Sequence, residues 1–159
     1  MKNSVLINFI NLTSNEKEMV LEWRNHPNIK RWMYTQEDIS LDNHLNFIKS
    51  LKNNNEKLYF LVKKESSYIG VIDFTNIKKN RADIGLYSNP QIYGNGSLLM
   101  EIICDYGFNT LKIKKLVAEV FVSNKKAFNL YNKFNFKETG TKIINNKEVI
   151  CMELKNENR

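Results

Sequence analysis

The sequence predicts a single α/β domain with a mixed sheet, an α+β arrangement that contains both parallel and antiparallel strands. Short runs rich in β-branched and aromatic residues alternate with amphipathic segments, so the hydrophobic period switches between about 2 and about 3.6 residues. Several β-rich runs follow one another directly, whereas one central pair is separated by a helix. The 159 residues fit one compact domain, 1–159, and no linker or internal repeat divides them.

The first expected elements are a strand and two helices. Residues 5–10 form an apolar run that predicts a strand. Residues 13–16 offer a capping box for a helix that must stop near His26, because Pro27 follows. Ser40 is placed to cap a second helix, whose apolar residues recur at helical spacing.

Three β-rich runs come next and predict an antiparallel meander. The expected strands and helices of this second part are 58–64, 68–74, 82–87, helix 98–106, strand 116–122, helix 125–134, and strands 137–144 and 147–154. Asn145 and Asn146 join the last two strands as a type I′ turn pair. The predicted order is therefore β-α-α-β-β-β-α-β-α-β-β.

The formal net charge is +7, and most of the excess lies in one region. Between residues 110 and 142, eight lysines stand against two acidic residues, Glu119 and Glu138. A local excess of this kind fits either a solvated basic face or a site for a small anionic ligand. Nucleic acid is not expected as a partner, because no RNP, KH or helix-turn-helix pattern accompanies the lysines.

The apolar segments of the chain are too short for a membrane. The N-terminal run is interrupted by polar residues, and no stretch of about 18 apolar residues is present. We therefore expect a cytoplasmic protein without a membrane partner. Cys104 and Cys151 have no CxxC spacing and too few companions for zinc, so two buried, reduced thiols and no metal site are expected.

The segment from Gln91 to Ser97 has the pattern of a phosphate-binding loop. Gln91, Gly94 and Gly96 stand at the spacing Gln-x-x-Gly-x-Gly, between a predicted strand and a predicted helix. A helix N-terminus carries free N–H groups and partial positive charge, and glycines let these amides approach a pyrophosphate. Asn95 and Ser97 add polar groups to the same segment. A glycine-rich turn that only caps the helix is the structural alternative.

A second pattern lies downstream of this loop. Asn124-x-x-Ala127-x-x-x-Tyr131 follows a predicted strand and is itself followed by Asn135-Phe136. The two patterns, in this order, resemble the acetyl-CoA-binding region of the GNAT superfamily of N-acetyltransferases, and the order of elements resembles the GNAT fold over essentially the whole chain. Many members have glycine before that phenylalanine, but Asn135 tolerates the same left-handed backbone.

The GNAT resemblance implies that acetyl-CoA is the co-substrate and that the two halves of the chain bind different substrates. Residues 82–154 would bind acetyl-CoA, with its pyrophosphate on residues 91–97 and Asn124 against its acyl arm. Residues 1–80 would bind the acceptor. The resemblance is compatible with a homodimer.

Acetyl transfer to an amine needs a neutral amine, a polarised thioester carbonyl and a proton for the departing thiolate. The resemblance places Tyr131 beside the CoA sulfur, where its phenol would be the general acid. Glu119 interrupts an apolar strand, which is costly unless the carboxylate is solvated or useful, and it is the candidate general base. The alternatives are a core tyrosine and an ordinary salt-bridged glutamate.

The N-terminal half carries the features expected to select the acceptor. Residues 21–28, 32–34, 39–41 and 44–48 resemble the bacterial N-acetyltransferases of pseudaminic acid biosynthesis, which serve flagellin glycosylation. Those enzymes acetylate the 4-amino group of a UDP-linked amino sugar. The resemblance therefore implies transfer of acetyl to UDP-4-amino-4,6-dideoxy-N-acetyl-β-L-altrosamine.

The same resemblance implies the acceptor contacts. Arg24 and His44 would meet the UDP phosphates, Thr75 and Asn76 would line the nucleotide-sugar cleft, and Tyr87 would lie near the sugar diphosphate. Arginine with histidine suits a diphosphate, because both present N–H donors to anionic oxygens. Asn76 departs from the family pattern, since a relative has lysine there. Arg24 as a surface ion-pair partner and His44 as a solvent-facing residue are the alternatives.

Two other functions remain open from the sequence. A ribosomal-protein or N-terminal peptide acetyltransferase would share the acetyl-CoA patterns but would need a groove for a peptide. A non-catalytic acyl-CoA-binding module would need neither Tyr131 nor Glu119.

Overall fold

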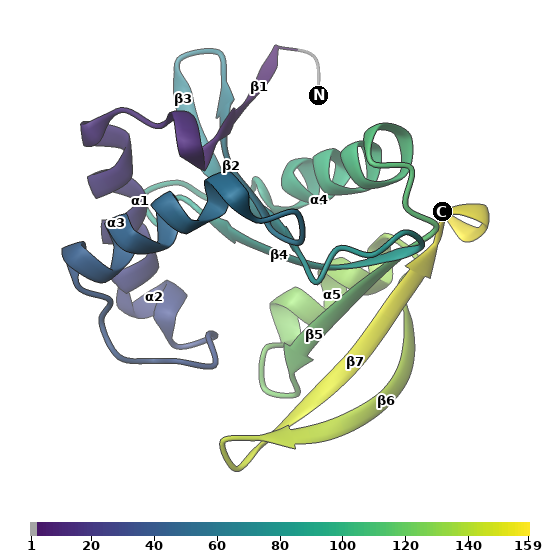
Figure 1. Cartoon of the computed structure of the whole chain (residues 1–159). Coiled ribbons are helices and arrows are strands. Elements are labelled where there is room, and N and C mark those ends of the chain that lie inside the picture. The colour runs from purple at the N-terminus through teal and green to yellow at the C-terminus, as the bar shows by residue number, and fades with distance from the viewer. Residues whose placement is uncertain (1–2) are drawn as a thin grey trace.

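The computed structural model describes residues 3–159 and consists of one seven-stranded sheet flanked by helices (Figure 1). The strands are β1 (Ser4–Asn8), β2 (Leu58–Lys64), β3 (Ser67–Thr75), β4 (Arg81–Ser88), β5 (Lys115–Phe121), β6 (Lys137–Ile144) and β7 (Lys147–Lys155). The helices are α1 (Ser14–Asn25), α2 (Pro27–Lys30), α3 (Leu41–Ser50), α4 (Gly96–Asp105) and α5 (Lys125–Lys133).

The sheet is mixed, as predicted, and has the order β1-β2-β3-β4-β5-β7-β6. Every neighbouring pair is antiparallel except β4 and β5, which are parallel and are joined through α4. Their pairing covers only residues 81–83 of β4 and ends at Asp83 opposite Val117. The two strands part beyond this point, so a ligand placed between them can hydrogen bond to the free strand edges.

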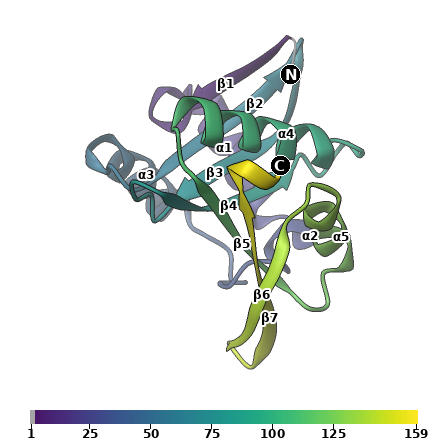
Figure 2. The same ribbon diagram turned by 90° about the vertical axis from the view of Figure 1, so that its right-hand side faces the viewer.

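The helices cover the two faces of the sheet and bury two separate cores. Alternate residues of β3 point to opposite faces, so Phe74 joins the core under α4 whereas Val71 joins the core under α1 and α3. In Figure 1 the helices α1 to α3 lie together on the left, and the β6–β7 hairpin runs from the right-hand side down to the bottom of the view. Figure 2 shows α4 lying across the strands and α5 beside the hairpin.

At most ends of helices and strands, the capping and turn residues adopt the roles predicted from the sequence. Thr13 caps α1 in a complete capping box, and Ser40 caps α3. Asn145 and Asn146 both have positive φ, which the type I′ turn requires. Asn135, where relatives have glycine, has φ 71°.

Three differences from the predicted elements have local causes. The first strand ends at Asn8, whose side chain accepts a bond from the Ile10 amide and starts a 3₁₀ turn. Pro27 stops α1 but also begins the short helix α2, with His26 as its N-cap. After α4 the chain continues in a π-helical turn, Tyr106–Thr110, rather than ending at residue 106.

The cysteines and the apolar segments match most of what was predicted. Both cysteines are free thiols, and Cys104 is buried, but Cys151 is only half-buried because it lies on β7 opposite Glu119 and faces the cleft side of the sheet. Within residues 3–159, none of the helices is long and apolar enough to span a bilayer.

Candidate active site

A large cleft runs between the N-terminal helices, the splayed strands β4 and β5, and the N-terminal ends of α4 and α5. Its volume is about 1360 Å³, larger than the roughly 300–1,000 Å³ of an ordinary small-molecule pocket. All of the predicted site residues line it except Gln91 and Asn95. The cleft therefore brings the predicted acceptor residues and the predicted acetyl-CoA residues into one continuous space.

The N-terminus of α4 opens onto the cleft with free backbone donors. Asn95 is the N-cap, yet its side chain makes no capping hydrogen bond, so the first amides of the helix are left for a ligand. Gly94 has φ 86°, a conformation that disfavours other residues, and a Cβ at Gly96 would lie 3.4 Å from Leu130. Ser97 accepts a bond from Lys133 at 2.9 Å, which places a cation beside the helix end. The arrangement suits a pyrophosphate.

Helix α5 brings its N-cap Asn124 and, near its other end, Tyr131 to the cleft. Asn124 caps α5 by accepting a bond from the Ala127 amide at 3.2 Å. Tyr131 is buried, packs against Phe136, and still reaches the cleft wall. Burial raises the pKa of its phenol well above the ordinary value, and the negative charge of Asp73 adds to the rise. The phenol therefore keeps its proton at neutral pH.

Arg24 lies on α1 with part of its guanidinium buried and unsatisfied. One terminal nitrogen donates to the Thr35 carbonyl at 2.7 Å, whereas Nη1 is buried and has no hydrogen-bond partner among residues 3–159. Burial lowers the pKa of this guanidinium, although an arginine remains charged at any ordinary pH. Arg24 is not part of a surface ion pair, and a buried donor without a partner is costly unless a ligand supplies one.

His44 is buried on α3 rather than exposed to solvent. Its Nε2 lies 2.9 Å from the Lys17 carbonyl oxygen, so this nitrogen is the donor and ties α3 to α1. Burial lowers the pKa of the ring, which favours the neutral form and leaves Nδ1 without a proton. The structure thus gives His44 a packing role, and its contact with a diphosphate stays a prediction that requires ring protonation.

The remaining predicted acceptor residues lie on β3, β4 and the turn between them. Thr75 ends β3, and Asn76 follows with φ 47° and donates to Asp83 at 2.7 Å. Asn76 therefore holds an acidic side chain instead of adding a positive charge. Tyr87 lines the cleft on β4, and burial raises the pKa of its phenol.

Glu119 lies on β5 and is held on both carboxylate oxygens. Tyr34 donates its hydroxyl to one oxygen, and Lys142 of β6 forms an ion pair with the other. Tyr34 also packs edge-on against Phe121 and accepts, at its backbone oxygen, a 2.8 Å bond from Asn145. The segment between α2 and α3 is thereby fastened across the cleft to the β6–β7 hairpin. The general-base role of Glu119 stays a prediction.

Two polar residues that line the cleft, Tyr34 and Asp73, were not among the site residues predicted from the sequence. Tyr34 entered the sequence analysis only within residues 32–34, one of the segments of the family resemblance, because its partner Glu119 is 85 positions away. Asp73 stands in β3 between Ile72 and Phe74, and the alternation of that strand places it on the cleft face. An acid inside an apolar strand, the signal that singled out Glu119, could have found Asp73 too.

Chemically, the cleft combines three features that acyl transfer requires. The end of α4 and Lys133 have donors that an anionic carrier could use, the buried phenol of Tyr131 has a proton to give, and carboxylates on β3 and β5 line the cleft where an amine could bind. The fold and this site define an acyl-CoA-dependent amine acyltransferase.

The chain belongs to the GNAT acetyltransferase family, because the family described as "Acetyltransferase (GNAT) domain" matches residues 7–137. Two forms of acetyltransferase PseH from Campylobacter jejuni are similar to the chain at 44% and 43% identity over 131 residues. That stretch is 82% of this chain and 83% of the relative in both cases.

Solved structures agree with this relationship. The crystal structure of C. jejuni N-acetyltransferase PseH has a TM-score of 0.82 and 36% identity, and covers 96% of this chain and 98% of its own. A second structure of that enzyme, in complex with acetyl coenzyme A, has a TM-score of 0.81. Spermidine N-acetyltransferase from Vibrio cholerae has a TM-score of 0.88 at 22% identity, over 99% of this chain and 98% of its own, and this shows the fold alone.

These findings confirm the predicted GNAT fold, the acetyltransferase class and acetyl-CoA as co-substrate. They also confirm the predicted relationship to PseH, the N-acetyltransferase of pseudaminic acid biosynthesis.

Proposed function

We propose that the protein transfers acetyl from acetyl-CoA to the 4-amino group of UDP-4-amino-4,6-dideoxy-N-acetyl-β-L-altrosamine in pseudaminic acid biosynthesis. The similarity to PseH over four-fifths of the chain supports this acceptor. The observation that carries the proposal is the continuity of the cleft, which joins Arg24 on α1 to the free N-terminus of α4. A diphosphate at one end and a pyrophosphate at the other would each meet unsatisfied donors.

The acceptor side of the cleft fits an anion attached to an amine. The buried Nη1 of Arg24 gains a partner when a phosphate oxygen binds, which converts an unsatisfied donor into a charge-assisted hydrogen bond. The carboxylates of Asp73, Asp83 and Glu119 line the same cleft farther along and suit a cationic amine. A UDP-linked amino sugar carries both charges in one molecule.

On the acetyl-CoA side, residues 91–97 with the α4 N-terminus and Asn124 are proposed to hold the carrier. Tyr131 is proposed to protonate the CoA thiolate as the C–S bond breaks. Arg24, His44, Thr75 and Asn76 belong to the acceptor half, about 1–80, and the other proposed residues to the half of about 82–154. Tyr87 is the exception, because it lies in the second half and lines the cleft but is proposed to contact the acceptor.

A peptide acceptor is the weaker alternative. Tyr34 ties the segment between α2 and α3 to Glu119 and to the β6–β7 hairpin, so this crossing stands where an extended peptide would need an open groove. A homodimer is part of the proposal as well, and the exposed edge strand β6 is available for it.

The experiment is a comparison of acceptors. CoA release from acetyl-CoA is measured with the UDP-4-amino sugar, with the same sugar lacking UDP, with polyamines and with N-terminal peptides. We expect the UDP-4-amino sugar to give the highest kcat/KM and removal of UDP to lower it strongly. A peptide or polyamine that exceeds the nucleotide sugar, or absence of turnover on the nucleotide sugar, overturns the proposed acceptor.

A further inference from the structure

Asp73 is a carboxylate on the wall of the cleft to which neither the sequence nor the family relationship assigns a role. It lies on β3, opposite Tyr59 of β2 and Gly85 of β4 in the sheet register. A Cβ at Gly85 would lie 2.6 Å from Asp73 Oδ2, so the missing side chain of the glycine is what leaves room for the carboxylate. Within residues 3–159 no hydrogen bond or ion pair holds it.

The surroundings of Asp73 favour its protonated form. The titratable groups that face it from the neighbouring elements are Tyr59 of β2, Asp83 and Tyr87 of β4, Tyr131 of α5 and, beyond the tyrosines, Arg24 of α1. Burial and then the negative charge of Asp83 raise the pKa of Asp73 to about 7. A carboxyl group with this proton affinity is half ionised near neutral pH, which suits a general base.

Glu119 is the less suitable base of the two. Both of its oxygens are occupied, one by the hydroxyl of Tyr34 and the other by the ammonium of Lys142. The two donors therefore occupy the oxygens to which an acceptor ammonium would have to deliver its proton. Asp73 has neither kind of partner.

We propose that Asp73 binds the acceptor ammonium and takes its proton, and that Glu119 instead positions the segment of Tyr34 over the acceptor. This inference rests on the proposed function. The ammonium N–H bond breaks, its electron pair stays on nitrogen, and a new O–H bond forms on Asp73. The freed amine attacks the thioester carbonyl, and the C–S bond then breaks with the electron pair leaving on sulfur.

Tyr131 completes the proton transfers of the reaction. The phenol gives its proton to the CoA thiolate, and the second proton of the attacking nitrogen replaces it, while the proton on Asp73 goes to solvent. The negative charge of Asp73 is one cause of the raised Tyr131 pKa. Protonation of Asp73 removes that cause, so the phenol becomes a better acid at the stage at which the thiolate must leave.

The test is the pH dependence of kcat/KM for the acceptor, measured in wild type and in Asp73→Asn, Asp83→Asn and Glu119→Gln. Asp73→Asn should lower kcat/KM by about 10²- to 10⁴-fold and abolish the enzyme's acid limb near pH 7. Asp83→Asn should move that limb to lower pH, because it removes the neighbouring negative charge. Asp42→Asn, on the exposed surface of α3, is the matched control and should behave as wild type.

Folding is checked in the same variants. Removal of a desolvated carboxylate should leave Asp73→Asn at least as heat-stable as wild type at pH 8, and the acetyl-CoA thermal shift should persist. An Asp73→Asn enzyme within about threefold of wild type with an unchanged acid limb overturns the inference. Loss of the limb in Glu119→Gln, with the limb intact in Asp73→Asn, overturns it as well.

The acceptor assay tests the proposed function, whereas the pH series and an NMR titration test the role of Asp73. If wild type does not acetylate the UDP-4-amino sugar, the proposed function fails, and the pH series is repeated with the best amine of the acceptor panel. A ¹³C NMR titration of the free protein needs no acceptor at all. It should show a carboxyl that titrates near pH 7, shifts down in Asp83→Asn and is absent from Asp73→Asn, and a value near 4 for Asp73 rules the inference out.

Discussion

At the scale of single residues, Arg24 shows how an unsatisfied group points to a ligand. Its Nη1 is buried without a partner in the described part of the chain, whereas its other terminal nitrogen holds the Thr35 carbonyl. The sequence indicated an arginine in the right region but could not show that half of the guanidinium is left free. That information depends on residue 35, which only the folded chain brings to Arg24.

We predict that Arg24→Ala raises the KM for the UDP-sugar by about 10- to 100-fold, since a hydrogen bond to a charged group contributes roughly 1.5–3 kcal/mol. The KM for acetyl-CoA should stay nearly unchanged, because Arg24 is proposed to contact only the acceptor. Steady-state kinetics with each substrate varied in turn gives the answer. Arg159→Ala, at the exposed C-terminus, is the control, and equal changes in both KM values would point to a folding role.

The family resemblance predicted Tyr131 as the general acid. Its packing in the structure allows a variant that tests this role alone. Tyr131→Phe removes the phenolic proton without removing the ring that packs on Phe136. We expect kcat to fall by about 10²- to 10⁴-fold while the fold and acetyl-CoA binding persist. The change in kcat is measured by following CoA release, both in single-turnover and in steady-state assays. A fast Tyr131→Phe enzyme with an unaltered pH profile would leave Tyr131 as a packing residue.

At the scale of elements, the N-terminus of α4 is the clearest link between sequence and site. The spacing of Gln91, Gly94 and Gly96 predicted a loop before a helix, and the structure adds that the helix lacks a side-chain cap. Gln91, which is exposed, and Asn95, which is the N-cap of α4, lie outside the cleft lining. Spacing alone does not say which side chains of a loop face a ligand.

Replacement of both Gly94 and Gly96 by alanine should reduce the stabilisation of the protein by acetyl-CoA. The φ of 86° at Gly94 is unfavourable for alanine, so the loop must shift away from the amide positions of the cradle. Thermal unfolding with and without acetyl-CoA measures the shift. Gly140→Ala is the matched control, because a Cβ there meets nothing within 4 Å. A double variant that folds and shifts like wild type would remove the loop from the carrier site.

His44 ties two helices together, and this makes the stability of the acceptor half depend on pH. Its pKa is lowered in the folded state, so the unfolded chain binds more protons below the ordinary value of about 6.5. The stabilisation is therefore present above that pH and is lost as pH falls through the folded-state pKa. Asp73, whose pKa is raised, contributes with the opposite sign.

We predict that wild type loses thermal stability from pH 7 to pH 5 more steeply than His44→Gln. Glutamine keeps an N–H donor for the Lys17 carbonyl but does not titrate, and comparison of the two proteins cancels the effect of Asp73. Differential scanning calorimetry at several pH values gives the two curves. Parallel curves would show that His44 is not held neutral by the fold.

At the scale of the whole molecule, the patterns at residues 91–97 and 124–136 and the order of strands and helices were enough to predict the fold. Strand and helix periods, the capping box at Thr13 and the Asn145–Asn146 turn are local signals, so a single sequence is enough to find them. The closure of the cleft by Tyr34, Glu119 and Lys142 is not local, because three separate segments meet there. Such contacts cannot be read from spacing along the chain.

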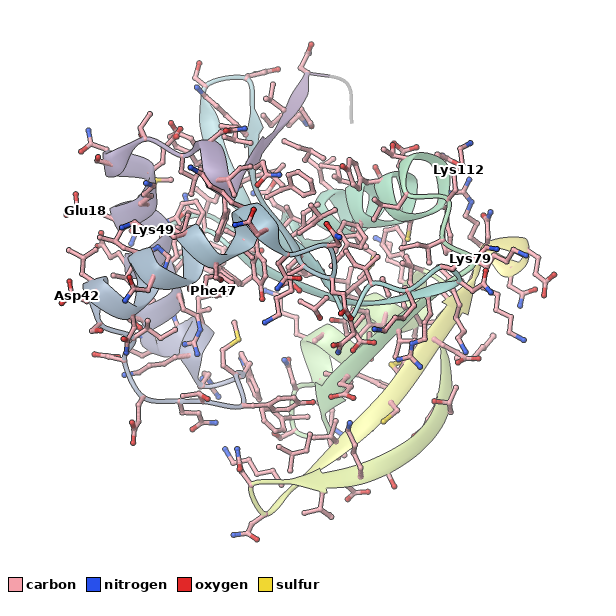
Figure 3. The ribbon with its side chains drawn as sticks, in the orientation of Figure 1. Glu18, Asp42, Phe47, Lys49, Lys79 and Lys112 are labelled. Carbon is pink, nitrogen blue, oxygen red and sulfur yellow. The ribbon has the colours of Figure 1, made fainter. Side chains whose placement is uncertain are left out.

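The basic residues divide into some that line the cleft and others that lie on the outer surface. The lysine excess between residues 110 and 142 reaches the cleft only at Lys126, Lys133 and Lys142. Figure 3 shows Lys79 and Lys112 pointing outward at the end opposite to Glu18 and Asp42, which lie on α1 and α3. Part of the basic excess is thus an ordinary solvated surface, and part lies where an anionic carrier is proposed to bind.

The position of the transferred acetyl group tests the proposed function most directly. The protein is incubated with [1-¹³C]acetyl-CoA and UDP-4-amino-4,6-dideoxy-N-acetyl-β-L-altrosamine, and the product is examined by ¹H–¹³C correlation NMR. We predict one labelled carbonyl per sugar, correlated with H4 through the new amide and formed together with free CoA. A label on a hydroxyl group, on another molecule or nowhere would contradict the proposed function.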